Sequence, residues 1–151
     1  MIRHLHLNII ISALVAITSI VTLASCEVHS YDNGDLEGFW QLRSIEKLNG
    51  CKQKLYNTPM YWSFQAKLAE IRQEDIKAQE YFFRFDRSKD SLRLYSPILD
   101  NRDKGDIPVT DPTELFGFGI FHLDETFCID ELNSETMVLH SDSIKAYFRK
   151  Y

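Results

Sequence analysis

The stretch FCIDELNSETMVLHSDSIKAYF, residues 127–148, decides the fold of this chain. Apolar side chains recur there at every second position within three groups: Phe127 and Ile129; Met137 and Leu139; and Ile144, Ala146 and Phe148. A period of two predicts three strands that each bury one face. The connections between them are short and polar, which favours antiparallel pairing of neighbours.

The same alternation runs back to residue 39. It places Trp40 and Leu42 on one face of a strand, and it predicts a longer strand over residues 62–69 with Trp62, Phe64 and Leu68 facing inward. Phe83 and Phe85 share the inward phase of the next strand. The pattern predicts an all-β domain of seven or eight antiparallel strands. Because such sheets lose their edges by closing or stacking, we expect a small barrel rather than a sandwich.

One short helical turn is expected within this β pattern. Asp111-Pro112-Thr113-Glu114 combines a capping Asp, Pro at the first helical position and Glu three residues after the cap. Gly117 and Gly119 follow soon afterwards, so we expect a single turn.

The N-terminal residues have the layout of an export signal: a short polar start followed by a diluted apolar stretch. They end in Leu23-Ala24-Ser25-Cys26, which resembles a bacterial lipobox. The resemblance implies a lipoprotein signal peptide over 1–25, cleavage before Cys26, and lipidation of that thiol. It also implies an exported protein attached to the cell envelope, with the outer membrane of a Gram-negative bacterium as the expected location. An uncleaved membrane helix with an incidental cysteine is the alternative.

Residues 26–35 are polar and predict a tether, and residues 36–151 have the length of one domain. The whole chain carries a net charge of −5, and loss of Arg3 with the leader makes it −6. This balance argues against nucleic acid as a partner, because nucleic acid requires a concentrated basic face. It also argues against electrostatic docking on anionic lipid.

Two cysteines, Cys51 and Cys128, remain in the mature chain once Cys26 is lipidated. In an oxidising compartment they could form a disulfide. Two free thiols are the alternative, and the sequence leaves both open.

Three segments of the mature chain resemble lipocalin-like domains of small bacterial lipoproteins. Leu36-Glu37-Gly38-Phe39-Trp40-Gln41-Leu42 is similar to their Gly-x-Trp opening. Residues 63–69 and the strand-turn-strand rhythm of 127–148 are similar to later parts. The resemblance implies that Trp40 closes the barrel floor beneath a basic side chain from the last strand, for which Arg149 and Lys150 are the candidates.

The sequence holds no standard set of residues for catalysis or metal binding. His29, His122 and His140 are the histidines of the mature chain, and no nucleophile elbow, phosphate-binding glycine loop or His-Glu-x-x-His motif accompanies them. The segment 100–106 has the Gly of a calcium loop but Arg102 and Lys104 at ligand positions. We therefore expect neither an enzyme nor a cofactor or metal site.

An inward-facing set of mostly aromatic residues is the remaining candidate for function. It consists of Trp40, Leu42, Trp62, Phe64, Leu68, Phe83, Phe85, Phe127, Ile129 and Phe148. In a small barrel such residues either fill the interior or line a cavity for one ligand. The first outcome suits an accessory subunit that contacts another envelope protein. The second suits a binding protein for a small apolar or amphipathic ligand.

Overall fold

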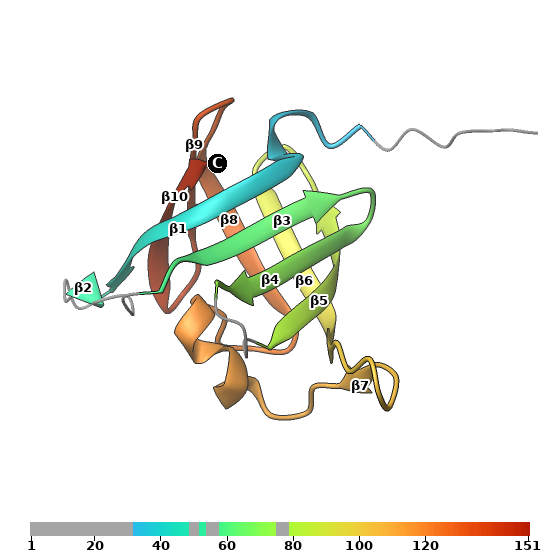
Figure 1. Ribbon diagram of the computed structural model, residues 1–151. Helices are drawn as coiled ribbons and strands as arrows, with labels where there is room; N and C mark the ends of the chain where they lie inside the picture. Colours follow the sequence, from blue (N-terminus) through green and yellow to red (C-terminus); the bar gives the residue numbers. More distant parts are fainter. Residues whose placement is uncertain (1–31, 49–51, 54–57, 75–78) are drawn as a thin grey trace, which may run out of the picture. The chain divides into compact units, whose positions relative to one another are not determined.

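The computed structural model describes residues 32–48, 52–53, 58–74 and 79–151, and this part of the chain forms a β-barrel (Figure 1). Eight antiparallel strands make its wall: β1 (Gly38–Lys47), β3 (Met60–Gln65), β4 (Leu68–Gln73), β5 (Glu80–Arg87), β6 (Ser91–Leu99), β8 (Glu125–Leu132), β9 (Thr136–His140) and β10 (Ile144–Lys150). Two short strands are added outside this ring. β2 (Lys52–Gln53) pairs with β1, and β7 (Ile107–Pro108) pairs with β6.

The barrel closes because β1 pairs with a neighbour on each side. Along one edge it pairs with β3, and along the other it pairs with β10, from Trp40 opposite Lys150 to Lys47 opposite Ile144. The remaining strands follow one another as neighbours around the wall. Closure removes the sheet edges, which confirms the predicted barrel and excludes the sandwich.

The predicted strand over residues 62–69 is wrong, because the chain turns back within it. Ala66 has a positive φ of 53°, and Gln65 pairs with Leu68 across the resulting hairpin. Trp62 and Phe64 lie opposite Ile71 and Ala69, so the inward phase of β4 falls on those two residues. Leu68 is 48% exposed. A turn that reverses the chain also resets the phase of the alternation, so Leu68 does not belong to the interior.

One end of the barrel is closed by a 3-10 turn, η2 (Gly34–Leu36), and by Trp40. The Trp40 indole N–H donates to the carbonyl of the buried Leu36 at 2.8 Å. Lys150 Nζ lies 4.8 Å from the Trp40 ring centroid and donates to the Asp35 carbonyl at 2.8 Å. The basic residue over the motif tryptophan is therefore Lys150, while Arg149 pairs with Gln41 in an outward row.

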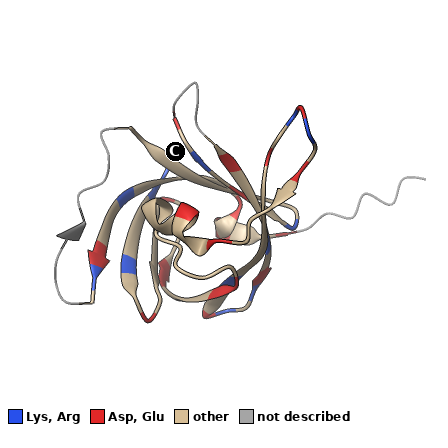
Figure 2. Cartoon of the chain, turned by 90° about the horizontal axis from the view of Figure 1, so that it is seen from below, with Lys and Arg blue, Asp and Glu red and all other residues tan. Residues whose placement is uncertain are grey.

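The opposite end is covered by a second 3-10 helix, η3 (Pro112–Phe118). Figure 2, viewed toward this end, shows η3 lying across the ring of strands. The predicted start is confirmed, because Asp111 accepts a hydrogen bond from the Thr113 amide. The helix is longer than the single turn expected. It continues because its Leu115 and Phe118 are buried against the core at this end of the barrel.

The described core of the barrel draws on the whole wall. Its buried members extend from Leu36 to Phe148 and come from every wall strand. Residues 31–151 also form one compact unit. A compact unit with its own core can fold by itself, so residues 31–151 can be studied as a separate domain. Among the described residues, no helix has the length and apolarity needed to cross a membrane.

Candidate functional site

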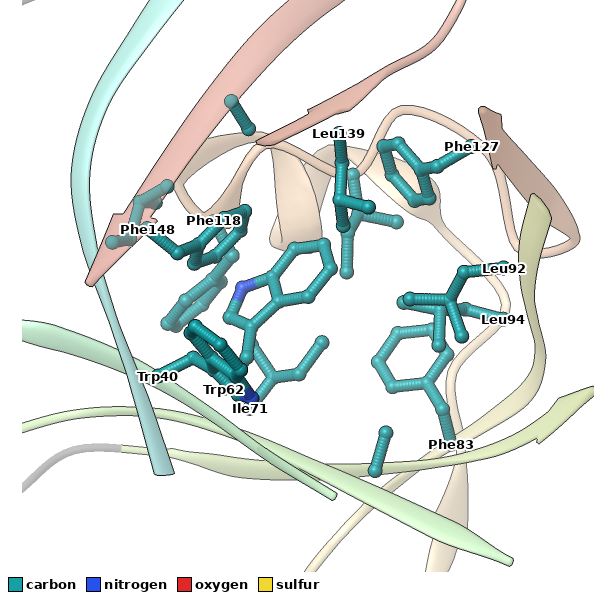
Figure 3. Close-up of a cluster of buried hydrophobic side chains, with 14 of the residues drawn as sticks. Trp40, Trp62, Ile71, Phe83, Leu92, Leu94, Phe118, Phe127, Leu139 and Phe148 are labelled. Carbon is teal, nitrogen blue, oxygen red and sulfur yellow. The ribbon is translucent and has the colours of Figure 1, made fainter. Parts of the chain in front are cut away.

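The predicted inward residues meet in the barrel interior, with one exception. Eight of the ten are buried: Trp40, Leu42, Trp62, Phe64, Phe83, Phe85, Phe127 and Phe148. Ile129 is partly buried and packs against the same cluster. Leu68 lies outside the barrel interior. Figure 3 shows side chains of the cluster pointing toward one another from opposite walls.

Aromatic side chains fill the space between these walls. The Trp62 ring, from β3, lies 4.9 Å from the Phe148 ring of β10 and 5.7 Å from the Phe127 ring of β8, measured between centroids. The Phe64 and Phe85 rings meet edge to face at 5.3 Å. Rings from opposite sides of the barrel are therefore in direct contact. Of the two outcomes that the sequence left open, this packing favours a filled interior.

A hollow opens instead on the outer wall, over β1, β3, β4 and β5. Its volume is about 730 Å³, which lies within the range of small-molecule sites. Three rings line it, from Phe39, Tyr61 and Tyr151. The polar lining comes from Arg72, Gln73, Glu74 and Glu80. We call this hollow the outer groove.

Tyr61 forms the floor of the outer groove. It alternates with the core residues Met60 and Trp62, so its ring points away from the interior, yet only 7% of the residue is exposed. The Tyr151 ring covers it edge to face at 5.3 Å. The Tyr61 hydroxyl donates to Glu74 Oε2 at 3.2 Å. Burial and, next, the charge of Glu74 raise the pKa of the Tyr61 hydroxyl, so it remains a neutral donor.

Sheet register places two charged residues of the groove, Arg72 and Glu80, in one row with Tyr61. Tyr61 of β3 lies opposite Arg72 of β4, and Arg72 lies opposite Glu80 of β5. The Arg72 guanidinium lies 3.4 Å from Glu70 and 4.0 Å from Glu80, and its Cζ lies 5.7 Å from the Phe39 ring centroid. Arg72 is therefore held by two carboxylates and one ring.

Sequence reasoning missed the outer groove. The available signal was Phe39 and Tyr61, two aromatic residues in the outward phase of strands whose other phase forms the core. Outward aromatic residues on adjacent strands indicate a candidate interaction or ligand-binding surface. The row from Tyr61 to Glu80, however, depends on the turn at Ala66 and could not be read without the register.

Of the predicted histidines, His29 lies outside the described residues, while His122 and His140 line one hollow of about 290 Å³ together with Cys128 and Asp142. His140 Nδ1 lies 2.7 Å from Asp130 Oδ1, and Lys145 Nζ lies 2.8 Å from the other Asp130 oxygen. The hydrogen bond from Lys145, followed by that from His140, lowers the pKa of the Asp130 carboxyl. In the part of the chain that the structure describes, no three His, Cys, Asp or Glu side chains are arranged to hold a metal ion. The cluster of Asp130, His140 and Lys145 therefore links β8, β9 and β10 on the barrel surface.

Cys128 lies exposed on β8 as a free thiol. Cys51, its predicted partner, lies outside the described residues. The bridge between the two cysteines therefore stays a prediction.

Solved structures with the same fold come from several bacteria. A lipocalin-like protein from Bacteroides uniformis is 22% identical, with a TM-score of 0.60 over 78% of this chain and 100% of that one. An uncharacterized protein from Bacteroides eggerthii is 19% identical, with a TM-score of 0.58 over 77% and 99% of the two chains. A protein from Burkholderia xenovorans is 12% identical, with a TM-score of 0.52 over 76% and 82%.

These similarities establish the fold, and a family model establishes the family. No curated protein matches the sequence. The model of the lipocalin-like domain matches residues 21–151, which is most of the chain and includes every strand of the barrel. The closed wall, the floor built on Trp40 and this match agree, and the chain belongs to the lipocalin-like domain family.

Proposed function

We propose that this protein is an exported lipoprotein, held to the envelope through Cys26, whose lipocalin-like domain binds a small amphipathic ligand in the outer groove. One observation carries the second part: the interior is packed with rings, while a groove of about 730 Å³ lies on the outer wall. Lipocalin-like barrels are suited to ligand binding. In this barrel the space for a ligand lies outside the core.

The outer groove offers what an amphipathic ligand needs. The rings of Phe39, Tyr61 and Tyr151 supply apolar contact. Arg72, Gln73 and the two carboxylates supply hydrogen-bonding groups on the same surface. A ligand pocket combines an apolar lining with a few polar groups that fix orientation.

Chemical-shift mapping tests the position of the site. The domain, residues 31–151, is titrated with octyl glucoside below its critical micelle concentration. We expect saturable shifts centred on Phe39, Tyr61 and Arg72, and their loss in Tyr151→Ala. Tyr151 is 83% exposed, so its truncation leaves the core intact. Shifts centred on Trp62, Phe127 and Phe148 would instead place the ligand inside the barrel and overturn the proposal.

The anchor is tested on the full chain in a Gram-negative host. The lipobox resemblance supports processing before Cys26 and acylation of its thiol. We expect Cys26→Ala to remain unprocessed and to lack the acyl mass, with Cys128→Ala as the matched cysteine control. Normal maturation of Cys26→Ala would refute the lipoprotein assignment.

An accessory subunit is the second candidate, and the exposed rings beside the groove favour it. Phe39 is 42% exposed and Tyr151 is 83% exposed on one face. Aromatic residues are enriched at protein interfaces. If this candidate is right, native mass spectrometry of gently solubilised envelopes will show a defined hetero-complex that Tyr151→Ala dissociates, and the isolated domain will bind no amphiphile.

A further inference from the structure

The carboxylates around the outer groove outnumber its cation. Glu74 and Glu80 line it, and Glu70 lies beside Arg72 on β4. Among the residues that the structure describes, the cation that lines the groove beside these three carboxylates is the Arg72 guanidinium. Arg149, a cation of the same outward row, pairs with Gln41 and is not part of the described lining. The described lining therefore carries more negative than positive charge.

Arg72 is already engaged, which leaves an unbalanced negative charge facing the groove. Its guanidinium contacts Glu70 and Glu80 and lies over the Phe39 ring. Among the described residues, Glu74 receives its side-chain hydrogen bond from a neutral hydroxyl, that of Tyr61. An incoming anion would have to displace Arg72 from these partners. An incoming cation finds the Glu74 carboxylate available.

The rings favour the same sign of charge. The face of an aromatic ring carries negative electrostatic potential and attracts a cation within about 6 Å of its centroid. Tyr61 and Tyr151 stand edge to face beside Glu74, at 5.3 Å between centroids. Tyr151, which is 83% exposed, and the Glu74 carboxylate line the same hollow, and an accessible ring beside a carboxylate suits a quaternary ammonium group.

We propose that the outer groove selects a small organic cation, with the positive head against Tyr151 and Glu74 and the apolar body toward Phe39. This proposal rests on the proposed function and adds to it the charge of the ligand. Three probes of nearly equal shape but different charge test this selection: choline, its neutral carbon analogue 3,3-dimethylbutan-1-ol, and the anion 3,3-dimethylbutanoate. Each is titrated into the domain at constant ionic strength, with the Tyr61 and Phe39 resonances observed.

We expect choline to bind at least about fivefold more tightly than the neutral alcohol, as a cation–π contact with a carboxylate implies, and the anion to bind most weakly. Glu74→Gln preserves shape and removes the charge, so it should reduce the preference for choline and leave the affinity for the alcohol unchanged. Glu135→Gln, on the exposed turn between β8 and β9, is the matched control and should change nothing.

The outcomes distinguish this inference from the proposed function. Equal affinities of the three probes, or a choline preference that Glu74→Gln does not reduce, would overturn the selection of a cation while the groove remains a ligand site. Absence of choline shifts in the groove would overturn it as well. Failure of the proposed function would appear separately, as octyl glucoside shifts inside the barrel.

Discussion

The Lys150 ammonium lies over the Trp40 indole, 4.8 Å from the ring centroid, and joins the last strand to the first at the barrel floor. The same ammonium donates to the Asp35 carbonyl at 2.8 Å, so one side chain links β10, β1 and the turn before β1. The contact closes the end of the barrel at which β1 begins.

Replacement of Lys150 by Met should lower the free energy of unfolding by about 1 kcal/mol, because a cation–π contact and one hydrogen bond are lost while the alkyl chain is retained. Lys150→Arg should be close to the wild type, since a guanidinium can make both contacts. Urea unfolding measures the difference. An unchanged midpoint in Lys150→Met would show that the floor does not depend on this contact.

The two tryptophans allow a matched comparison. Trp40 Nε1 donates to Leu36, whereas the buried Trp62 Nε1 has no hydrogen-bond partner among the described residues. Trp40→Phe and Trp62→Phe remove similar volumes, but only the first leaves a buried carbonyl unpaired. We expect Trp40→Phe to be more destabilising by about 1 kcal/mol. Measuring both in a Lys150→Met background removes the cation–π contribution, and equal losses there would contradict the expectation.

Gly119 ends η3 with a φ of 85°, in the left-handed region. A Cβ at this position would lie 3.1 Å from Ile45 Cδ1 and 3.2 Å from Ile144 Cδ1. Gly119→Ala should therefore lower the free energy of unfolding by about 2 kcal/mol, through backbone strain and crowding together.

Gly105→Ala is the control for backbone strain alone. Gly105 has a similar φ of 81°, and nothing lies within 4 Å of its added Cβ. We expect a loss of about 1 kcal/mol at this site. If the two variants unfold at the same denaturant concentration, η3 is not packed against Ile45 and Ile144 as the structure shows.

Tyr81 connects η3 to the barrel wall. Its hydroxyl lies 3.3 Å from Glu114 Oε2 on η3, and burial, followed by the charge of Glu114, raises its pKa to about 12. Because the folded protein keeps the hydroxyl proton longer than the unfolded chain does, stability should fall as the pH rises from about 10 to about 12.

Absorbance titration of the phenolate near 295 nm, compared between wild type and Tyr81→Phe, isolates this one group. The difference curve should have its midpoint near pH 12 while the protein remains folded. A midpoint at the ordinary tyrosine value would show that η3 does not shield the hydroxyl.

Cys128 should react with a maleimide in the folded domain without prior reduction, because its thiol is exposed on β8. Peptide mapping locates the label, and Cys128→Ser is the control for labelling elsewhere. Protection of Cys128 that disappears on addition of reductant would instead establish the predicted bridge to Cys51.

The sequence by itself determined the class of fold, the closed barrel and most of its core. Alternation at Trp40, Phe83 and Phe127 depends only on neighbouring residues, so it can be read locally. The start of η3 at Asp111 could be predicted for the same reason, because an N-cap residue is a local signal.

Tertiary structure alone decided the phase of β4, the packing of the interior and the outer groove. The turn at Ala66 exposed Leu68 and set Tyr61 opposite Arg72. Rings from β3, β8 and β10 are in contact because the barrel is narrow. The width of the barrel cannot be predicted from the residues of one strand. Local patterns report which face of a strand is buried; which side chains meet across strands depends on register and closure, and these follow from the pairing of distant segments.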